Sequence, residues 1–119
     1  MTASLSPVLA GKRLVVIEDN PLVRMGLEDI LRDAGAFIVR SFDQKADAAV
    51  LDVNLGSGIS SIPIAERLHQ RNVPFVFYSG QPEDILAPVR KSFPSAPVIN
   101  KPSEPKRIVD EVAALWKTR

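Results

Sequence analysis

The stretch Leu14-Val15-Val16-Ile17-Glu18-Asp19-Asn20-Pro21 decides the fold. Its first four residues form an apolar run without polar alternation, which is typical of a strand buried on both faces of a parallel sheet. Asn20 is a good N-cap and Pro21 suits the first helical position, so a helix is expected directly after the acidic pair. Gly35 is expected to close this helix at its C-terminal end. The apolar residues that recur at helical spacing are Val23, Leu27, Ile30, Leu31 and Ala34.

The rest of the chain repeats this alternation of strand and helix. Further helices are expected from about Ser61 to Arg71 and after Lys101-Pro102, with Ser103 placed to cap the last one. The further strands are expected over Phe37 to Phe42, Ala48 to Leu51, Val73 to Tyr78 and Val98-Ile99. Alternation of this kind predicts an α/β fold with a doubly wound, five-stranded parallel sheet.

Two segments depart from a regular pattern. Only the seven residues from Ser41 to Asp47 separate the second and third apolar runs. Crossing to the third strand takes roughly 18 Å, and seven extended residues reach about 23 Å. A bare crossover fits this length, whereas a helix with its loops does not. The helix between these strands is therefore expected to be absent or reduced to a loop. The segment from Pro82 to Pro94 carries Pro88 in its middle, which predicts a short or irregular helix there.

Length and composition bound the function. The 119 residues allow one folded domain, expected over 13–119 after a flexible N-terminal tail over 1–12. The formal net charge is only +1, and the sequence has no stripe of Lys and Arg, so nucleic acid is not an expected partner. The chain has no cysteine and a single histidine, His69, so any metal would be held by oxygen. No apolar run approaches a membrane span and no signal peptide is evident, which predicts a cytoplasmic protein without a membrane partner.

Polar residues stand at the ends of the predicted strands. They are Glu18-Asp19, Asp52, Ser79 and Lys101. In doubly wound sheets ligands bind outside the carboxyl ends of the strands, so these side chains are expected on one rim. Three crowded carboxylates favour a bound cation, and Mg²⁺ suits oxygen donors combined with a phosphate. A carboxylate beside a hydroxyl and an ammonium suits phosphoryl transfer to that carboxylate. The simpler alternative is a plain ion pair between Asp52 and Lys101.

The ordered combination of these endings resembles a known family. Glu18-Asp19, Val50-Leu51-Asp52-Val53-Asn54, Ser79-Gly80 and Lys101-Pro102 together are similar to the receiver domain of bacterial two-component response regulators. The resemblance covers Arg13 to Lys117. It implies a flavodoxin-like sheet in the order 2-1-3-4-5, and a cis peptide bond at Lys101-Pro102.

The resemblance also implies a role for each site residue. Asp52 would be the phosphoacceptor, Ser79 the switch hydroxyl and Lys101 the cation that binds the phosphoryl group. The implied Mg²⁺ site consists of Asp19 and Asp52 as direct ligands, Glu18 acting largely through water, and the backbone carbonyl of Asn54. The implied donor is a sensor histidine kinase, and the signal would pass onward by protein contact or by transfer to a phosphotransfer partner.

One stretch resembles a narrower group. Pro74-Phe75-Val76-Phe77-Tyr78-Ser79-Gly80 is similar to strand 4 of stand-alone alphaproteobacterial receivers that read Pro-Phe-x-Phe-Ala-Thr-Gly, whose partners are often HWE-type kinases. Most receivers also carry an aromatic residue three positions before the lysine. Val98 stands there instead, and Tyr78 is a candidate substitute.

Two other functions compete with phosphoacceptance. One is an interaction scaffold that keeps the receiver fold but signals without phosphate. The other is a haloacid-dehalogenase-like phosphatase, which Asn54 disfavours because those enzymes need a second acid at that position. On the leading interpretation the chain is not an enzyme but a phosphoacceptor that assists its own phosphorylation and dephosphorylation.

The missing helix has a consequence for the surface. Phe37, Val39 and neighbouring apolar side chains of the first strand are expected to be partly uncovered. Exposed apolar patches often mark interaction sites, and a second copy of the chain is the first candidate, giving a homodimer. Alternatively the loop from Asp43 to Asp47 and the helix near Ser61 shift over the gap.

Overall fold

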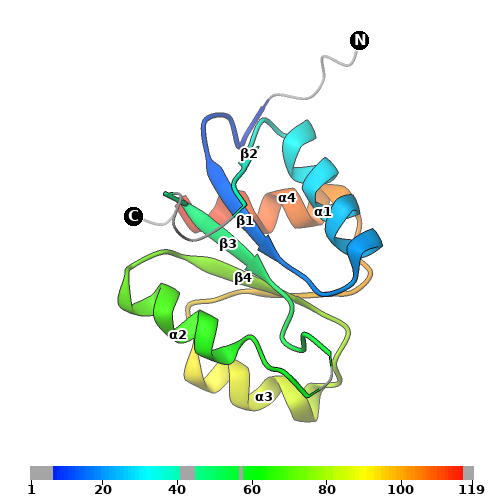
Figure 1. Ribbon diagram of the computed structural model, residues 1–119, viewed down its shortest axis with the longest axis vertical. Coiled ribbons are helices and arrows are strands. Elements are labelled where there is room, and N and C mark those ends of the chain that lie inside the picture. The colour runs from blue at the N-terminus through cyan, green and yellow to red at the C-terminus, as the bar shows by residue number, and fades with distance from the viewer. Residues whose placement is uncertain (1–6, 41–44, 57, 117–119) are drawn as a thin grey trace.

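The computed structural model describes residues 7–40, 45–56 and 58–116, which form one parallel sheet with helices on both faces (Figure 1). The five strands lie in the order β2-β1-β3-β4-β5, which confirms the predicted flavodoxin-like α/β fold. The strands are β1 (Arg13–Ile17), β2 (Phe37–Ile38), β3 (Ala48–Leu51), β4 (Phe75–Ser79) and β5 (Val98–Asn100). The helices are α1 (Pro21–Asp33), α2 (Ile62–Gln70), α3 (Glu83–Ser92) and α4 (Pro105–Ala113), followed by a 3₁₀ turn over Ala114–Trp116.

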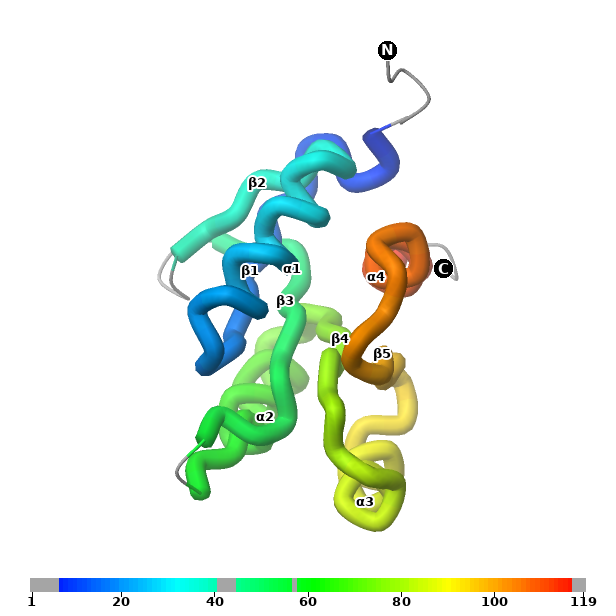
Figure 2. Tube along the Cα trace, turned by 90° about the vertical axis from the view of Figure 1, so that its right-hand side faces the viewer, coloured from blue at the N-terminus to red at the C-terminus, as the bar shows by residue number. Residues whose placement is uncertain are grey.

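The sheet separates two apolar cores. Helices α1 and α4 cover one face, and α2 and α3 cover the other, as Figure 2 shows for α4 against α2 and α3. All residues of β3 and β4 are buried, because these central strands are covered on both faces. This is the environment that the unbroken apolar runs of the sequence predict.

Helix α1 begins and ends as its sequence predicts. The Asn20 side chain accepts hydrogen bonds from the backbone N–H of Leu22 (2.9 Å) and Val23 (3.2 Å). Gly35 follows the helix with φ of +102°. A Cβ at Gly35 would lie 2.9 Å from Cβ of Pro7, so the chain that precedes β1 packs tightly against this turn.

The segment over 7–12 is part of the folded domain, so the expected tail is wrong for these residues. Leu9 is fully buried in the core beneath α1 and α4. Its N–H donates to the carbonyl of Ala34 at 2.9 Å. A single buried leucine in a short turn has no periodicity, so no local pattern predicts this packing.

The crossover from β2 to β3 contains no helix among its described residues, 39–40 and 45–47, in agreement with the expectation. Residues 41–44, into which the predicted second strand extended, lie outside the described part of the chain. Strand β2 is shorter than predicted, although the N–H of Val39 still donates to Leu14 of β1 at 2.8 Å. Asp47 anchors the return, since its carboxylate accepts a hydrogen bond from the N–H of Arg13 at 2.8 Å.

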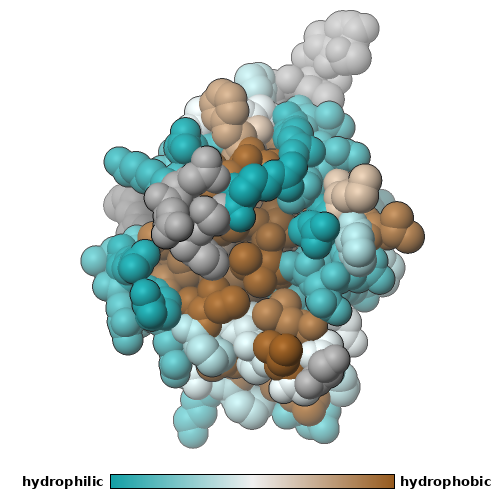
Figure 3. Space-filling model, viewed as in Figure 1, coloured by the Kyte–Doolittle hydropathy of each residue, from teal (hydrophilic) through white to brown (hydrophobic). Residues whose placement is uncertain are grey.

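The surface left by the missing helix is smaller than predicted. Phe37 is 63% exposed, as expected, but Val39 is only 5% and Val15 only 2% exposed. Ala46, from the crossover itself, packs against the same core and takes part of the place of a helix. Apolar residues nevertheless gather in the middle of this face, between α1 and α2 (Figure 3).

Helix α3 is longer and more regular than its sequence suggested. It runs for ten residues with Pro88 inside it. Pro88 removes a backbone donor, but Leu86 and Val89 are buried against the sheet while Pro88 itself is exposed. Burial of the apolar stripe therefore outweighs the local cost. Among the described helices, none has the length and apolar character required to span a bilayer.

The turn after β5 confirms one expectation and corrects another. The Lys101-Pro102 bond is cis. Ser103 does not cap α4, whose N-cap is Glu104. The Ser103 hydroxyl donates instead to the carbonyl of Asn100 and closes the turn.

Candidate functional site

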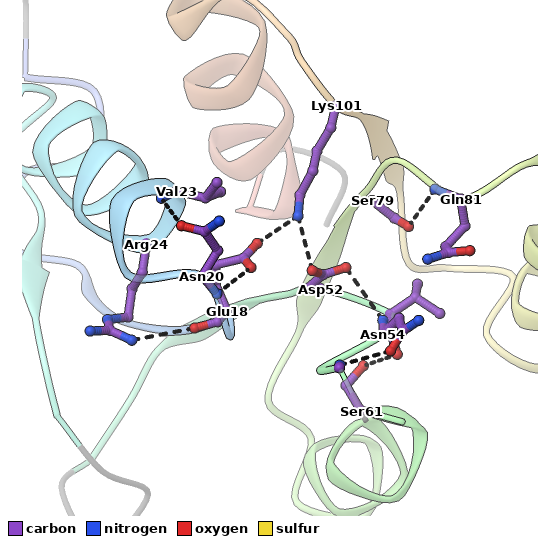
Figure 4. A network of polar contacts seen from close by, with 12 residues as sticks. Glu18, Asn20, Val23, Arg24, Asp52, Asn54, Ser61, Ser79, Gln81 and Lys101 are labelled. Atoms are coloured by element: carbon purple, nitrogen blue, oxygen red, sulfur yellow. Dashed lines mark hydrogen bonds and ion pairs between the residues drawn. The ribbon is translucent and has the colours of Figure 1, made fainter. Parts of the chain in front are cut away.

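Three of the predicted site residues meet above the carboxyl ends of the strands (Figure 4). Nζ of Lys101 lies 2.7 Å from Oε1 of Glu18 and 2.9 Å from Oδ2 of Asp52. Glu18 follows β1, Asp52 follows β3, and Lys101 follows the edge strand β5. The lysine side chain therefore reaches across the end of β4 to two acids on inner strands.

Glu18 and Asp52 are buried, at 7% and 8% exposure. Buried carboxylates are costly unless they are paired and hydrogen-bonded. The second oxygen of each has such a partner: the N–H of Asn20 donates to Glu18 Oε2 at 3.0 Å, and the N–H of Asn54 donates to Asp52 Oδ1 at 3.3 Å. The backbone after each strand thus holds both acids toward the lysine.

The pocket favours the charged form of Lys101. Partial burial lowers the pKa of its ammonium, but hydrogen bonds and charge attraction from Glu18 and Asp52 outweigh this and leave the pKa above its ordinary value. The Tyr78 ring adds a cation–π contact, with its centroid 5.5 Å from Nζ. Lys101 is therefore a fixed positive charge beside Asp52 at neutral pH.

Ser79 ends β4, the strand between β3, which leads to Asp52, and β5, which leads to Lys101. It is buried, at 1% exposure. Its hydroxyl oxygen accepts a hydrogen bond from the N–H of Gln81 at 3.1 Å and points toward that residue in Figure 4. The predicted hydroxyl is thus on the same rim, turned toward its own loop.

The loop after β3 closes over the acidic side of the site. The Asn54 side chain accepts a hydrogen bond from the N–H of Gly56 at 2.8 Å. Gly56 has φ of +87° and lies against the carboxylate of Asp19, which is exposed. Gly56 carries no chemical group that marks it as a site residue; its position two residues after Asn54, the last predicted ligand, is the only signal in the sequence.

Comparison with known proteins shows the family of this chain. No protein-family model matches the sequence, and no curated protein matches it. SdrG from Sphingomonas melonis Fr1 is 36% identical over 87% of this chain and 95% of SdrG, with a TM-score of 0.68. The response regulator PhyR from Brucella abortus is 26% identical, with 90% of this chain covered and a TM-score of 0.69. The chain belongs to the response regulator receiver domains. It spans 49% of the PhyR chain, about half.

Magnesium is bound by at least one protein with this fold. The response regulator TrrA from Thermotoga maritima has been solved in complex with Mg²⁺ and BeF; it is 19% identical to this receiver domain, with 87% of this chain and 98% of that chain covered and a TM-score of 0.74. In this receiver the predicted donors are carboxylate oxygens and one backbone carbonyl, a set that fits a hard cation. Within the described residues, however, no three acidic or histidine side chains lie close enough together to hold a metal ion. The single positive charge of Lys101 is shared between the Glu18 and Asp52 carboxylates, so the crowded trio expected from the sequence is not preformed.

The candidate substitute for the missing aromatic is on the wrong face of the sheet. Tyr78 belongs to the core beneath α1 and α4, whereas Val98 packs in the core beneath α2 and α3. The residue paired with Val98 is Phe77, which is fully buried. Tyr78 therefore cannot occupy the position that the switch aromatic has in most receivers, and its contact with Lys101 is a separate feature of this domain.

Proposed function

We propose that this receiver domain accepts a phosphoryl group from a sensor histidine kinase on Asp52, in a reaction that requires Mg²⁺. The observation that carries the proposal is the 2.9 Å contact between Asp52 Oδ2 and Lys101 Nζ at the end of a central strand. On this proposal the domain is not an enzyme acting on a separate substrate. It is a phosphoacceptor whose own side chains assist phosphorylation and dephosphorylation.

The residues suggest how the transfer proceeds. An Asp52 carboxylate oxygen attacks phosphorus, the bond from phosphorus to the histidine nitrogen breaks, and the nitrogen keeps the electron pair. Lys101, which already donates to Asp52, can donate to a phosphoryl oxygen as negative charge spreads over the group. Ser79 can supply a further hydrogen bond once its hydroxyl turns away from the N–H of Gln81.

A bound Mg²⁺ would supply positive charge for the phosphoryl oxygens. Asp19, Asp52 and the backbone carbonyl of Asn54 would hold it, with Glu18 acting largely through water. Because Lys101 pairs with Glu18 and Asp52 in the structure, entry of a second cation requires that this pairing loosen. After transfer, Lys101 can donate to a phosphoryl oxygen, so its positive charge stays beside the added negative charge.

The partners follow from the same proposal. The kinase would be of the HWE type if the resemblance over Pro74 to Gly80 extends to function. The phosphorylated domain would signal in the cytoplasm by protein contact or by transfer to a phosphotransfer partner.

The test is phosphorylation by a small donor. The purified protein is incubated with acetyl phosphate and Mg²⁺, and its intact mass is measured. A gain of one phosphoryl group is expected for the wild type and for Asp33→Asn, which changes an exposed aspartate at the end of α1. No gain is expected for Asp52→Asn or in excess chelator. A wild type that stays unmodified contradicts the proposal and favours the phosphate-independent scaffold.

A further inference from the structure

Gly56 lies in contact with the carboxylate of Asp19. An ideal Cβ built on Gly56 would be 2.8 Å from Asp19 Oδ2 and 3.5 Å from its Cγ. The first distance is shorter than real side chains allow, so any residue other than glycine would force one of the two groups to move. The backbone at Gly56 therefore forms one wall of the space that the Asp19 carboxylate occupies.

The loop that carries Gly56 is closed by its own hydrogen bonds. The N–H of Gly56 donates to the Asn54 side chain at 2.8 Å, and the N–H of Ile59 donates to the carbonyl of Gly56 at 2.8 Å. The N–H of Leu55 donates to the carbonyl of Ile59 at 2.8 Å, and Asn54 forms an antiparallel β-bridge with Ser60. Gly56 cannot withdraw without breaking these bonds.

Asp19, by contrast, has little else to hold it. Its side chain is exposed, and it makes no hydrogen bond or ion pair with the described residues 7–40, 45–56 and 58–116. Its neighbour Glu18 is fixed by Lys101 and by the N–H of Asn20. In a collision between Gly56 and Asp19, the carboxylate is therefore the group that yields.

We propose that Gly56 is a positioning residue that holds the Asp19 carboxylate in place for cation binding. This inference rests on the proposed function in that Asp19 is taken as a Mg²⁺ ligand. A side chain at position 56 would push this carboxylate aside while leaving Asp52 and Lys101 where they are. The loop after β3 thereby sets how well the acidic side of the pocket binds a divalent cation.

The chain provides a matched control in Gly58. Gly58 also has a positive φ, of +78°, but a Cβ there would meet nothing within 4 Å. Alanine at either position carries the backbone cost of a left-handed conformation. Only alanine at position 56 also crowds Asp19.

The experiment measures Mg²⁺ binding directly, by chemical-shift titration with MgCl₂ in the absence of a phosphodonor. Gly56→Ala is expected to weaken binding about tenfold, the lower end of the effect of changing groups that orient metal ligands. Gly58→Ala is expected to stay within about twofold of the wild type, because it lacks the contact with Asp19. Equal losses in the two variants would overturn the proposal, because backbone strain would then explain both.

A second pair of variants tests whether the effect passes through Asp19. In an Asp19→Ala background, Gly56→Ala should cause no loss of Mg²⁺ affinity beyond that of Gly58→Ala, and a separate, persistent loss would contradict the inference. Thermal melts cover the case in which Gly56→Ala folds poorly: Asp19→Ala should then raise the melting temperature of Gly56→Ala, because it removes the crowding but not the backbone cost, and should not raise that of Gly58→Ala; no rise in Gly56→Ala would contradict the inference. Intact mass after phosphodonor treatment tests the proposed function separately. A wild type that binds Mg²⁺ but is not phosphorylated contradicts only that function, and one that binds no Mg²⁺ overturns the positioning role.

Discussion

Lys101 and Glu18 form the shorter of the two ion pairs at the site, 2.7 Å across 83 residues of sequence, against 2.9 Å between Lys101 and Asp52. Glu18 is therefore a counter-ion of the lysine as well as a candidate metal neighbour. The pairing stabilises two buried carboxylates on one rim. It also means that a change in any of the three residues alters the charge balance of the other two.

The two acids after β1 should differ in their effect on Mg²⁺. Asp19 is exposed and makes no ion pair with described residues, while Glu18 is buried and paired with Lys101. Asp19→Asn is therefore expected to weaken Mg²⁺ binding by about tenfold or more. Glu18→Gln should weaken Mg²⁺ binding less, because this variant also removes the Glu18–Lys101 ion pair, which must loosen before the cation enters. Calorimetric titration with MgCl₂ checks the order of the two variants, and the reverse order would contradict the assignment of Asp19 as the direct ligand.

Lys101 should make stability depend on pH in the alkaline range. Its pKa is raised in the folded protein, because Glu18 and Asp52 outweigh the opposing effect of burial. The folded state therefore holds this proton more tightly than the unfolded chain, in which lysine titrates at about pH 10.4. The resulting stability is fully present below that pH and is lost as pH rises through the folded pKa.

Urea unfolding at a series of pH values from neutral to strongly alkaline checks this dependence. The free energy of unfolding of the wild type should fall more steeply above about pH 10 than that of Lys101→Met. Lys91→Met, which removes an exposed lysine of α3, should keep the wild-type slope. Identical slopes for the wild type and Lys101→Met would show that the ion pairs do not couple to folding.

Leu9 should behave as a core residue. It is fully buried, whereas its neighbour Val8 is 53% exposed. Leu9→Ala is expected to lower the free energy of unfolding by about 2–4 kcal/mol, and Val8→Ala by less than about 0.5 kcal/mol. Chemical denaturation of the two variants tests the packing, and similar small losses in both would return residues 7–12 to the role of a tail.

The exposed Phe37 should mediate self-association if the face without a helix is an interface. A homodimer is expected to appear with rising concentration in multi-angle light scattering, and Phe37→Ser should shift the equilibrium toward monomer. Met25→Ser on α1 is a suitable control, since Met25 is comparably exposed, at 55% against 63%. A wild type that stays monomeric at all concentrations would remove the dimer and leave Ala46 and Val39 as sufficient cover for this face.

The arrangement of the strands and their polar endings could be predicted because each rests on a local rule. Apolar runs that end in Glu18, Asp52 and Lys101 fix which side chains reach the carboxyl rim once the sheet is parallel. The Asn20 cap is equally local. These features need no knowledge of distant contacts.

The rest depends on tertiary packing that no local pattern records. Pro88 argues against a helix by itself, but burial of Leu86 and Val89 holds α3 together. Ser103 has the right residue type for a cap, yet the turn after β5 uses its hydroxyl. The ion pair between Lys101 and Glu18 also depends on tertiary structure, because it forms only if the edge strand β5 lies at the right distance from β1.

Peptide mapping after borohydride reduction identifies the phosphorylated residue directly. The protein is phosphorylated with acetyl phosphate and Mg²⁺, and borohydride then converts an aspartyl phosphate to homoserine, which tandem mass spectrometry locates in the sequence. We expect homoserine at position 52 and at no other aspartate. Homoserine at Asp19 or elsewhere, or none at all after a measured gain of mass, would contradict the assignment of Asp52 as the phosphoacceptor.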